Sequence, residues 1–283
     1  MTGILSLAED GLKRYWGDME KLAKLRSILS NYKKVIVAYS GGVDSSFLLK
    51  VAGDTLPKKN LVAVTAVSET YTRSELKQAK RIAKKIGVEH KIILTNELKD
   101  KNFAKNPIDR CYYCKKELFG RLELLSMRNG HGVVVDASNL DDKKDYRPGT
   151  IAKKECGVRS PLQEAGLTKD DIRKLSKKMN VETWNYPSMA CLASRIPYGQ
   201  KINKPTLRKI EKAEVYIKKQ GIREIRVRCH DKIARIEVGQ KEIKRFLNKK
   251  FCDKIIKYLK SLGFSYVVLD LEGYRTGSLN EVL

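Results

Sequence analysis

Residues 35–46 of this chain read Val-Ile-Val-Ala-Tyr-Ser-Gly-Gly-Val-Asp-Ser-Ser, and they decide the fold class. The β-branched run at 35–37 predicts a buried strand, and the apolar residues after the loop predict a helix. A strand that turns through glycines onto a helix N-terminus presents unpaired backbone N–H groups and the positive end of the helix dipole. The stretch therefore predicts a site for phosphate oxygens, to which Ser40, Ser45 and Ser46 add hydroxyl donors.

This loop is neither of the two commonest phosphate loops. It lacks the Gly-Lys-Ser/Thr end of a P-loop and the Gly-x-Gly-x-x-Gly of a dinucleotide fold. A Gly/Ser turn with an ordinary helix cap is the structural alternative, but a cap does not need paired glycines and paired serines around an aspartate. The pattern Ser-Gly-Gly-x-Asp-Ser at 40–45 resembles the pyrophosphate loop of the ATP-pyrophosphatase superfamily, which cleaves ATP to AMP and pyrophosphate.

Strands and helices alternate around the loop. After a helical segment over 1–31, we expect strands at 34–39, 61–67, 88–94 and 132–137, and helices at 45–55, 72–86, 113–128 and 168–179. This order predicts an α/β fold with a parallel sheet and helices on both faces. Ligands of such sheets bind at the carboxyl ends of the strands, so the loop and the segments after Val67 and Asp136 are expected to share one edge.

A second pattern begins near residue 200. The region 184–205 contains three prolines and little periodicity, which is typical of a functional loop. Beyond it we expect a small α+β unit with helices at 206–219 and 250–262 and strands at 222–229, 232–238 and 265–271. The chain is therefore predicted to form a PP-loop domain over 1–200 and a smaller substrate or oligomerisation domain over 201–283.

The charge balance is strongly basic, with 58 Lys+Arg against 33 Asp+Glu and a net charge of +25. Such an excess makes nucleic acid a candidate partner, although lysines at helical spacing are also typical of a solvated surface. The chain has neither an apolar run of about 20 residues nor a signal-peptide core. We therefore expect a cytoplasmic protein without a membrane partner.

Six cysteines in such a chain indicate metal, cluster or catalytic use rather than disulfides. Cys111 and Cys114 form a Cys-x-x-Cys at the start of a helix, and Cys191 lies in the proline-rich region. Three thiolates can hold three irons of a [4Fe–4S] cluster and leave the fourth iron open. A redox pair, a zinc site with an unidentified fourth ligand and inert thiols are the alternatives. The remaining cysteines are expected to be buried small residues: Cys156, Cys229 and Cys252.

The second unit contains an unusual set of charges. Strand alternation puts Arg226, Arg228 and His230 on one face, where two guanidinium groups could bind phosphate or carboxylate. A solvated hairpin face explains them as well. Glu214 falls inside the apolar stripe of the helix at 206–219, so its carboxylate needs a partner, either one of these arginines or a residue at the domain edge.

Together these motifs resemble the LarE family of ATP-dependent PP-loop sulfurtransferases, which make pyridinium-3,5-bisthiocarboxylic acid mononucleotide, the organic part of the nickel-pincer cofactor. The resemblance covers nearly the whole chain, and the most specific stretch is Cys191–Gly199. Its other motifs are Ser40–Ser46, Cys111–Cys114, Ser138-Asn139, Asp141-Asp142, Tyr146–Gly149, Ser160–Leu162, Arg226 with Arg228, and Gly273–Arg275.

The resemblance implies a reaction. The enzyme would adenylate a carboxylate of pyridinium-3,5-biscarboxylic acid mononucleotide with ATP and Mg²⁺, and then replace a carboxylate oxygen by sulfur. Some members sacrifice the cysteine at the position of Cys191 and keep dehydroalanine there. The presence of Cys111 and Cys114 resembles the three-cysteine class, whose [4Fe–4S] cluster carries a labile sulfide. A sulfide or other sulfur donor and a homo-oligomer, a hexamer in this family, are the implied partners.

The resemblance also implies roles for individual residues. Cys191 and Asp44 would be catalytic, and Asp44 would also position or ligate Mg²⁺. The nucleotide would be bound by Ser40, Gly41, Gly42, Asp44, Ser45, Ser46, Ala66 and Asn139. The anionic substrate would be bound by Ser194, Arg195, Glu214, Arg226, Arg228 and Arg275. The cluster would be bound by Cys111, Cys114 and Cys191.

Transfer RNA thiolation is the alternative function. Some PP-loop tRNA thiolases bind a [4Fe–4S] cluster through three cysteines, and the basic charge suits RNA. This chain lacks the flanking zinc-finger cysteine pairs or RNA-binding domain of several of them, and Cys191–Gly199 fits them poorly. A third hypothesis is a nucleotide-sensing module that only stores a cluster, against which the intact loop at 40–45 argues.

Overall fold

The computed structural model describes residues 2–128, 130, 132–144, 148–187, 189–275 and 277–281, with described side chains beginning at Trp16. Contacts divide the chain into two compact units. Unit 1 comprises Met1–Val67, Arg73–Thr95 and Cys111–Ser188, and unit 2 comprises Ser68–Thr72, Asn96–Arg110 and Met189–Leu283. The domain boundary near residue 200 stays a prediction.

Unit 1 is built on a parallel four-stranded sheet in the order β3-β2-β1-β4. Its strands are β1 (Val35–Ala38), β2 (Leu61–Val67), β3 (Glu89–Leu94) and β4 (Val133–Val135). Val35 pairs with Leu61 on one side and with Val133 on the other, so the carboxyl ends of these strands meet at one edge. The expected parallel sheet is confirmed.

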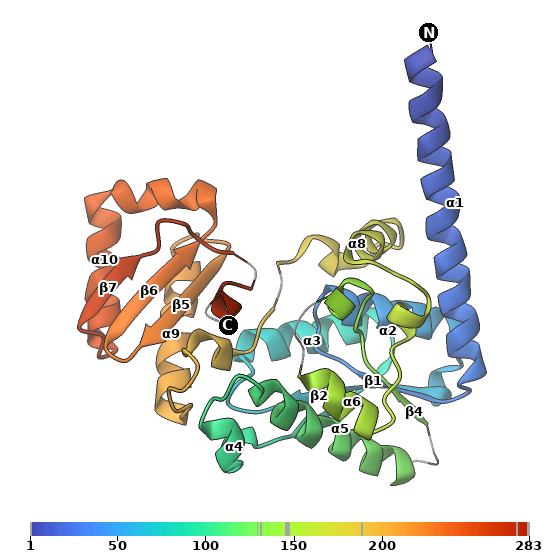
Figure 1. The fold of residues 1–283 in the computed structure, drawn as a ribbon, viewed down its shortest axis with the longest axis horizontal. Coiled ribbons are helices and arrows are strands. Elements are labelled where there is room, and N and C mark those ends of the chain that lie inside the picture. The colour runs from blue at the N-terminus through green and yellow to red at the C-terminus, as the bar shows by residue number, and fades with distance from the viewer. Residues whose placement is uncertain are drawn as a thin grey trace. The chain divides into compact units, whose positions relative to one another are not determined.

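Helices cover both faces of this sheet, as expected (Figure 1). The helices of unit 1 are α1 (Thr2–Asn31), α2 (Val43–Thr55), α3 (Arg73–Ile86), α5 (Arg110–Arg128), α6 (Gly149–Glu155), α7 (Pro161–Glu164) and α8 (Lys169–Lys178). Val35 and Val37 point into the core formed with α1, α2, α3 and α8, whereas Ile36 packs against Phe119 and Leu122 of α5. Strand alternation thus divides unit 1 into two cores.

The local differences from the sequence expectations are small and have physical causes. Helix α2 begins at Val43 rather than at residue 45, because the extended residue Gly42 already serves as its N-cap. Thr168 caps α8 and forms a capping box with Asp171. The short helices α6 and α7 were not expected, since seven and four residues are too few to show a hydrophobic period.

Unit 2 contains a separate three-stranded sheet in the order β5-β6-β7, with one antiparallel and one parallel pair. Its elements are α4 (Lys101–Ala104), α9 (Lys204–Lys219), β5 (Ile225–His230), β6 (Ile233–Val238), α10 (Lys249–Ser261) and β7 (Tyr266–Leu269). Helix α9 packs against β5 and α10 packs against β7. The expected small α+β unit is confirmed, and β5 begins three residues later than expected.

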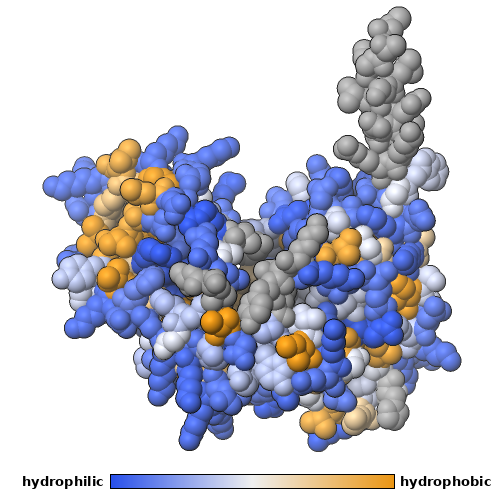
Figure 2. Space-filling model, in the orientation of Figure 1, coloured by the Kyte–Doolittle hydropathy of each residue, from blue (hydrophilic) through white to orange (hydrophobic). Residues whose placement is uncertain are grey.

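The surface is largely hydrophilic, with apolar side chains gathered over parts of unit 2 (Figure 2). Exposed apolar and aromatic residues of the small sheet include Ile233, Tyr266 and Val268. Within the described residues, no helix combines the length and apolar character needed to cross a membrane.

Candidate functional site

The phosphate loop between β1 and α2 is held together by its own hydroxyl groups. The Oγ atoms of Ser40 and Ser45 lie 3.0 Å apart, and Ser45 Oγ donates to the carbonyl of Gly42 at 3.3 Å. The N–H of Gly42 donates to Ser40 Oγ at 3.3 Å. Because the N–H groups in the first turn of a helix have no intrahelical acceptor, this loop and the start of α2 suit an anion.

Gly41 makes a close approach to helix α3 possible. Its φ angle is +75°, and a Cβ atom there would lie 2.9 Å from the Cα of Ala79. The side chain of Gln78 donates to the Gly41 carbonyl at 3.0 Å. A side chain at position 41 would therefore be strained and would push the loop away from α3.

Asp44, the aspartate of the loop, forms an ion pair with Lys169. Lys169 is the first residue of α8, and its backbone N–H donates to Asp141 Oδ2 at 2.8 Å. The Oδ1 atom of Asp44 is buried and has no hydrogen-bond partner among the residues that the structure describes. A carboxylate with one oxygen available beside a phosphate loop suits a divalent cation.

Sequence reasoning missed Lys169. A signal for it existed, because a lysine in the first turn of a helix opposes the positive end of the helix dipole. Such a residue is retained where a nearby anion compensates, and here that anion is Asp44.

Polar side chains also cluster directly after β4. The carboxylate of Asp136 accepts hydrogen bonds from Ser160 Oγ at 2.6 Å and from Ser138 Oγ at 2.5 Å. The buried Lys153 donates to Ser160 Oγ at 2.7 Å and lies 3.7 Å from Asp136 Oδ2. Asn139 Oδ1 accepts from the backbone of Asp141 at 3.0 Å, which fixes the turn that follows β4.

A cavity of about 580 Å³ adjoins this cluster. It is lined by Asp142, Lys143, Thr150, Lys153, Lys154, Val158, Arg159, Ser160, Gln163 and Glu164. Two contacts connect the wall of this cavity to the phosphate loop. Asp44 of the loop pairs with Lys169, and the Lys169 N–H donates to Asp141, which precedes the lining residue Asp142. The cavity is large enough for a small nucleotide and carries an excess of cationic side chains.

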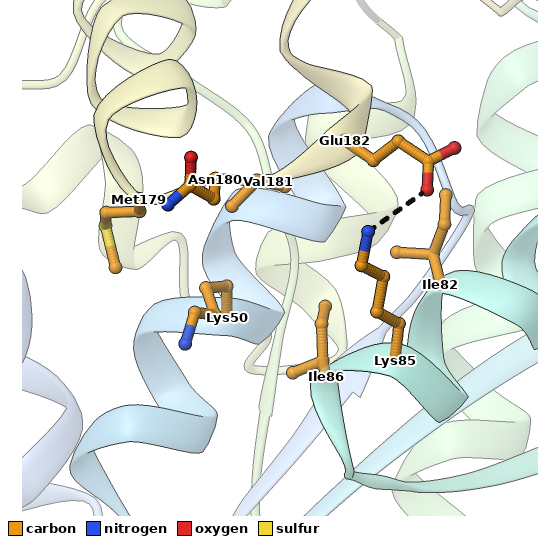
Figure 3. Close-up of a pocket in the computed structure, with 8 residues that line it drawn as sticks. All are labelled: Lys50, Ile82, Lys85, Ile86, Met179, Asn180, Val181 and Glu182. Atoms are coloured by element: carbon orange, nitrogen blue, oxygen red, sulfur yellow. Dashed lines mark ion pairs between the residues drawn. The ribbon is translucent and has the colours of Figure 1, made fainter.

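A second, smaller cavity of about 240 Å³ lies among α2, α3 and the residues after α8 (Figure 3). Its lining residues are Lys50, Ile82, Lys85, Ile86, Met179, Asn180, Val181 and Glu182. Lys85 lies 3.6 Å from Glu182 there, and Glu182 also pairs with Arg81 at 2.6 Å. None of these residues belongs to the phosphate loop or to the segments after β4, so this cavity is not part of the candidate site.

Cys111 and Cys114 lie in the first turns of α5, in unit 1. Cys111 is exposed and Cys114 is half-buried, and their spacing places them on one side of the helix. Gly149 packs against this helix end, because a Cβ there would lie 3.3 Å from the Cys111 carbonyl and 2.9 Å from Lys115 Cγ. The preceding motif residues Tyr146 and Arg147 lie outside the described residues.

Cys191 is exposed and lies in unit 2 as the N-cap of a short 3-10 helix, Leu192–Arg195. Ser194 closes this turn, donating to the Cys191 carbonyl through its N–H at 3.0 Å and its hydroxyl at 2.8 Å. The Leu192 N–H donates to the Thr70 carbonyl at 3.0 Å. Within the region 184–205, for which the sequence predicts an aperiodic loop, residues 191–195 therefore form an ordered turn.

Arg195 and Glu214 form a buried ion pair behind this turn. Both residues are 4% exposed, and the guanidinium donates to the two carboxylate oxygens at 2.9 and 3.2 Å. Arg195 Nη1 also donates to the carbonyls of Ala190 at 2.6 Å and Cys191 at 3.1 Å. The expected arginine partner of Glu214 is thus Arg195, rather than Arg226 or Arg228.

The arginines of β5 are buried, so the solvated hairpin face considered from the sequence is wrong. Arg228 donates to both carboxylate oxygens of Glu237, at 2.8 and 2.9 Å. Arg226 lies over the ring of Tyr274, with 5.0 Å from its Cζ to the centroid. Burial, with a smaller contribution from the nearby Arg195 cation, lowers the pKa of Arg226. The sheet face is covered by other segments of unit 2.

The structure thus groups the predicted site residues by unit. In unit 1 the loop residues, Asp44 and Asn139 are connected through Lys169 and Asp141, and Ala66 lies next to the carboxyl end of β2. In unit 2 the turn at Cys191 is joined to Glu214 and Arg228. Arg275 pairs instead with Glu281 at 2.8 Å.

All six cysteines lie within the described part of the chain, and none is in a disulfide. Cys229 is buried as expected, whereas Cys156 and Cys252 are half-buried. Among the described residues, no group of three or more His, Cys, Asp and Glu side chains is positioned to hold a metal ion.

Comparison with known proteins is consistent with this geometry. A family model for NAD synthase matches residues 20–107. The chain is 38% identical to the pyridinium-3,5-bisthiocarboxylic acid mononucleotide synthase of Lactiplantibacillus plantarum, over 93% of this chain and 95% of that protein. It is 41% identical to an uncharacterized protein of Synechocystis sp., over 93% of this chain and 98% of that protein. An uncharacterized protein of Methanocaldococcus jannaschii is 33% identical over 91% of this chain and 98% of its own length.

We predict that Gly41→Ala destabilises the protein more than Gly157→Ala does. Both glycines have positive φ, but only at Gly41 would the new Cβ meet another backbone, that of Ala79. Gly157→Ala should cost about 1 kcal/mol of unfolding free energy, and Gly41→Ala about 2 kcal/mol more because of overpacking. Urea denaturation measures both, and equal losses would show that the contact with α3 does not constrain the loop.

We further predict that Arg195→Gln lowers the unfolding free energy by about 3–5 kcal/mol, since it leaves the Glu214 carboxylate buried without a charge partner. The double variant Arg195→Gln/Glu214→Gln should recover part of this loss. Arg275→Gln is the matched control, because Arg275 pairs at the surface and its loss should leave stability unchanged. Wild-type stability of Arg195→Gln would contradict the buried pair.

Proposed function

This chain belongs to the LarE family of PP-loop enzymes, the family of the pyridinium-3,5-bisthiocarboxylic acid mononucleotide synthases, and we propose that it is an ATP-dependent sulfurtransferase of nickel-pincer cofactor synthesis. The observation that carries the proposal is the loop of Ser40–Ser46 at the carboxyl edge of a parallel sheet, with Asp44 paired to Lys169. A similarity of fold alone would not identify the reaction that the protein catalyses.

In the proposed first step the loop binds the pyrophosphate portion of ATP. A carboxylate oxygen of pyridinium-3,5-biscarboxylic acid mononucleotide attacks the α-phosphorus, and the bond from that phosphorus to the bridging oxygen of pyrophosphate breaks. The available oxygen of Asp44 supports its assignment as a Mg²⁺ ligand. The ammonium of Lys169 lies at the loop and would offset the negative charge that collects on the leaving group.

In the second step sulfur replaces the activated oxygen. An adenylate turns a carboxylate oxygen, which leaves poorly, into part of AMP, which leaves readily. A nucleophilic sulfur at the oxidation level of sulfide attacks the acyl carbon with its own electron pair. The bond from that carbon to the AMP oxygen then breaks, and AMP carries away the electron pair of that bond. Cys191 is proposed as the residue that serves this step, since its thiol is exposed on an ordered turn.

The proposed substrate ligands all belong to unit 2. Ser194 and Arg226 are assigned to the anionic mononucleotide, and Arg275 is a further candidate at the surface. Arg195, Glu214 and Arg228 were assigned to the substrate from the resemblance, and this assignment stays a prediction. The contacts of these three side chains support a role in shaping the turn.

The donor set of the chain suits an iron–sulfur cluster. Cys111 and Cys114 present two thiols from one side of α5, Cys191 presents a third on unit 2, and thiolates are the ligands such clusters require. These three residues would hold the [4Fe–4S] cluster, which when bound supplies the sulfur atom. A sulfide or other sulfur donor, a cytoplasmic location and a homo-oligomer, a hexamer by family resemblance, complete the proposal.

Thiolation of tRNA is the second candidate. It is favoured by one observation, the net charge of +25. Against it stands the near full-length similarity to a protein that is named for a mononucleotide product.

We predict that the mononucleotide substrate stimulates conversion of ATP to AMP and pyrophosphate, and that tRNA does not. Quantifying AMP in the presence of Mg²⁺ and each acceptor measures this directly. Lys169→Met should lower kcat/KM for ATP by about 100-fold, because a cation at the loop is lost. Lys174 lies on the same helix and forms an ion pair with Asp170 rather than with the loop, so Lys174→Met should act as wild type. Stimulation by tRNA alone would favour the second candidate.

A separate prediction concerns the cysteines. Anaerobic reconstitution with iron and sulfide should give the broad visible absorption of an iron–sulfur cluster, and Cys111→Ala, Cys114→Ala and Cys191→Ala should each lose it. Cys252→Ala is the control, since that thiol donates to the Phe246 carbonyl within unit 2. A full spectrum in any of the three variants would contradict ligation by three cysteines. Loss of sulfur from Cys191 during turnover, measured by mass spectrometry, would instead indicate a sacrificial cysteine.

A further inference from the structure

Glu237 has no role in the reaction proposed above, yet it is the most deeply buried carboxylate of unit 2 among the described residues, at 1% exposed. It lies on β6, opposite Arg226 in the strand register. Two other arginines, Arg228 and Arg235, donate hydrogen bonds to its carboxylate oxygens. Arg228 binds it through two nitrogens, and Arg235 donates to its Oε1 at 3.0 Å. A carboxylate with this many charged donors is held in one position.

Arg228 connects Glu237 to the turn that contains Cys191, because it binds both. Its Nη1 donates to the Ser194 carbonyl at 2.6 Å, and its Nη2 also donates to Ser278 Oγ at 2.8 Å. Each of its three guanidinium nitrogens therefore donates to an oxygen of unit 2. Because Arg228 is only 6% exposed, it needs the charge of Glu237 to stay buried where it can reach Ser194.

Ser194 is the residue that connects Arg228 to Cys191. Its N–H and hydroxyl both bind the Cys191 carbonyl, while its own carbonyl is bound by Arg228. The turn is thus tied at its far end by Arg228, and Arg195 ties its near end through the carbonyl of Cys191. Moving Ser194 would change the direction in which Cys191 points.

We propose that Glu237 is a positioning residue for Cys191, acting through Arg228 and the Ser194 carbonyl. The value of a fixed Cys191 rests on the proposed function, because a thiol that presents sulfur or binds iron must keep one geometry. The mechanical link itself does not depend on that function. It requires only the hydrogen bonds within unit 2.

Hydrogen exchange measured by mass spectrometry on the full-length protein tests the link without any activity. In Glu237→Gln, amides of residues 191–196 should exchange at least about tenfold faster, because the turn loses its anchor. Asp270→Asn is the matched control, since the Asp270 carboxylate lies 3.6 Å from Arg235, which also binds Glu237. Among the described residues, Arg228 binds Glu237, Ser194 and Ser278 but not Asp270. In this control variant the turn should exchange as in wild type.

A second variant keeps the test decisive if Glu237→Gln is unstable. Arg228→Gln/Glu237→Gln removes both charges, so β5 and β6 should regain protection while the turn still exchanges fast. Unchanged exchange at 191–196 in both variants, or an equal rise throughout unit 2, would overturn the proposal. If ATP turnover proves absent but the turn responds as described, the proposed function fails and this inference stands.

Discussion

A strand buried on both faces, β1, is the constraint on which unit 1 depends. Val35 and Val37 belong to one core and Ile36 to the other, so helices must cover both sides of the sheet. After the strand, the chain can reach solvent only once it has passed the buried residues, and Ser40 is the first exposed residue. It does so at the phosphate loop, where Gly41 lets the backbone pass close to α3. The position of the loop therefore follows from how its strand is buried.

Buried charge is the corresponding constraint in unit 2. Burying a guanidinium group is costly unless a carboxylate and several oxygens satisfy it, and here two such pairs lie behind one short turn. Arg195 pairs with Glu214, and Arg228 pairs with Glu237. Each arginine also donates a hydrogen bond from Nη1 to a backbone carbonyl of the turn that begins at Cys191. Charged residues that the sequence suggests as substrate ligands thus also hold this turn in place.

Periodicity predicted the strands and the longer helices of both units to within a few residues, because it reports local geometry and the face of each element that is apolar. Periodicity could not predict whether the arginines of β5 are buried. Alternation places Arg226 and Arg228 on one face of the sheet but does not say which segments cover that face. Glu214 was recognised as anomalous for its helix, but its partner Arg195 lies in a segment without any period.

The sequence by itself determined the α/β architecture, the family and the position of the phosphate loop between a strand and a helix, since each depends on residue types at short spacing. Only the tertiary structure decided which charges meet. Asp44 and Lys169 are 125 positions apart, and the pairing of Arg228 with Ser278 spans 50. Such contacts depend on how whole helices and strands pack, and packing is set by the sum of many small apolar contacts that no single motif encodes.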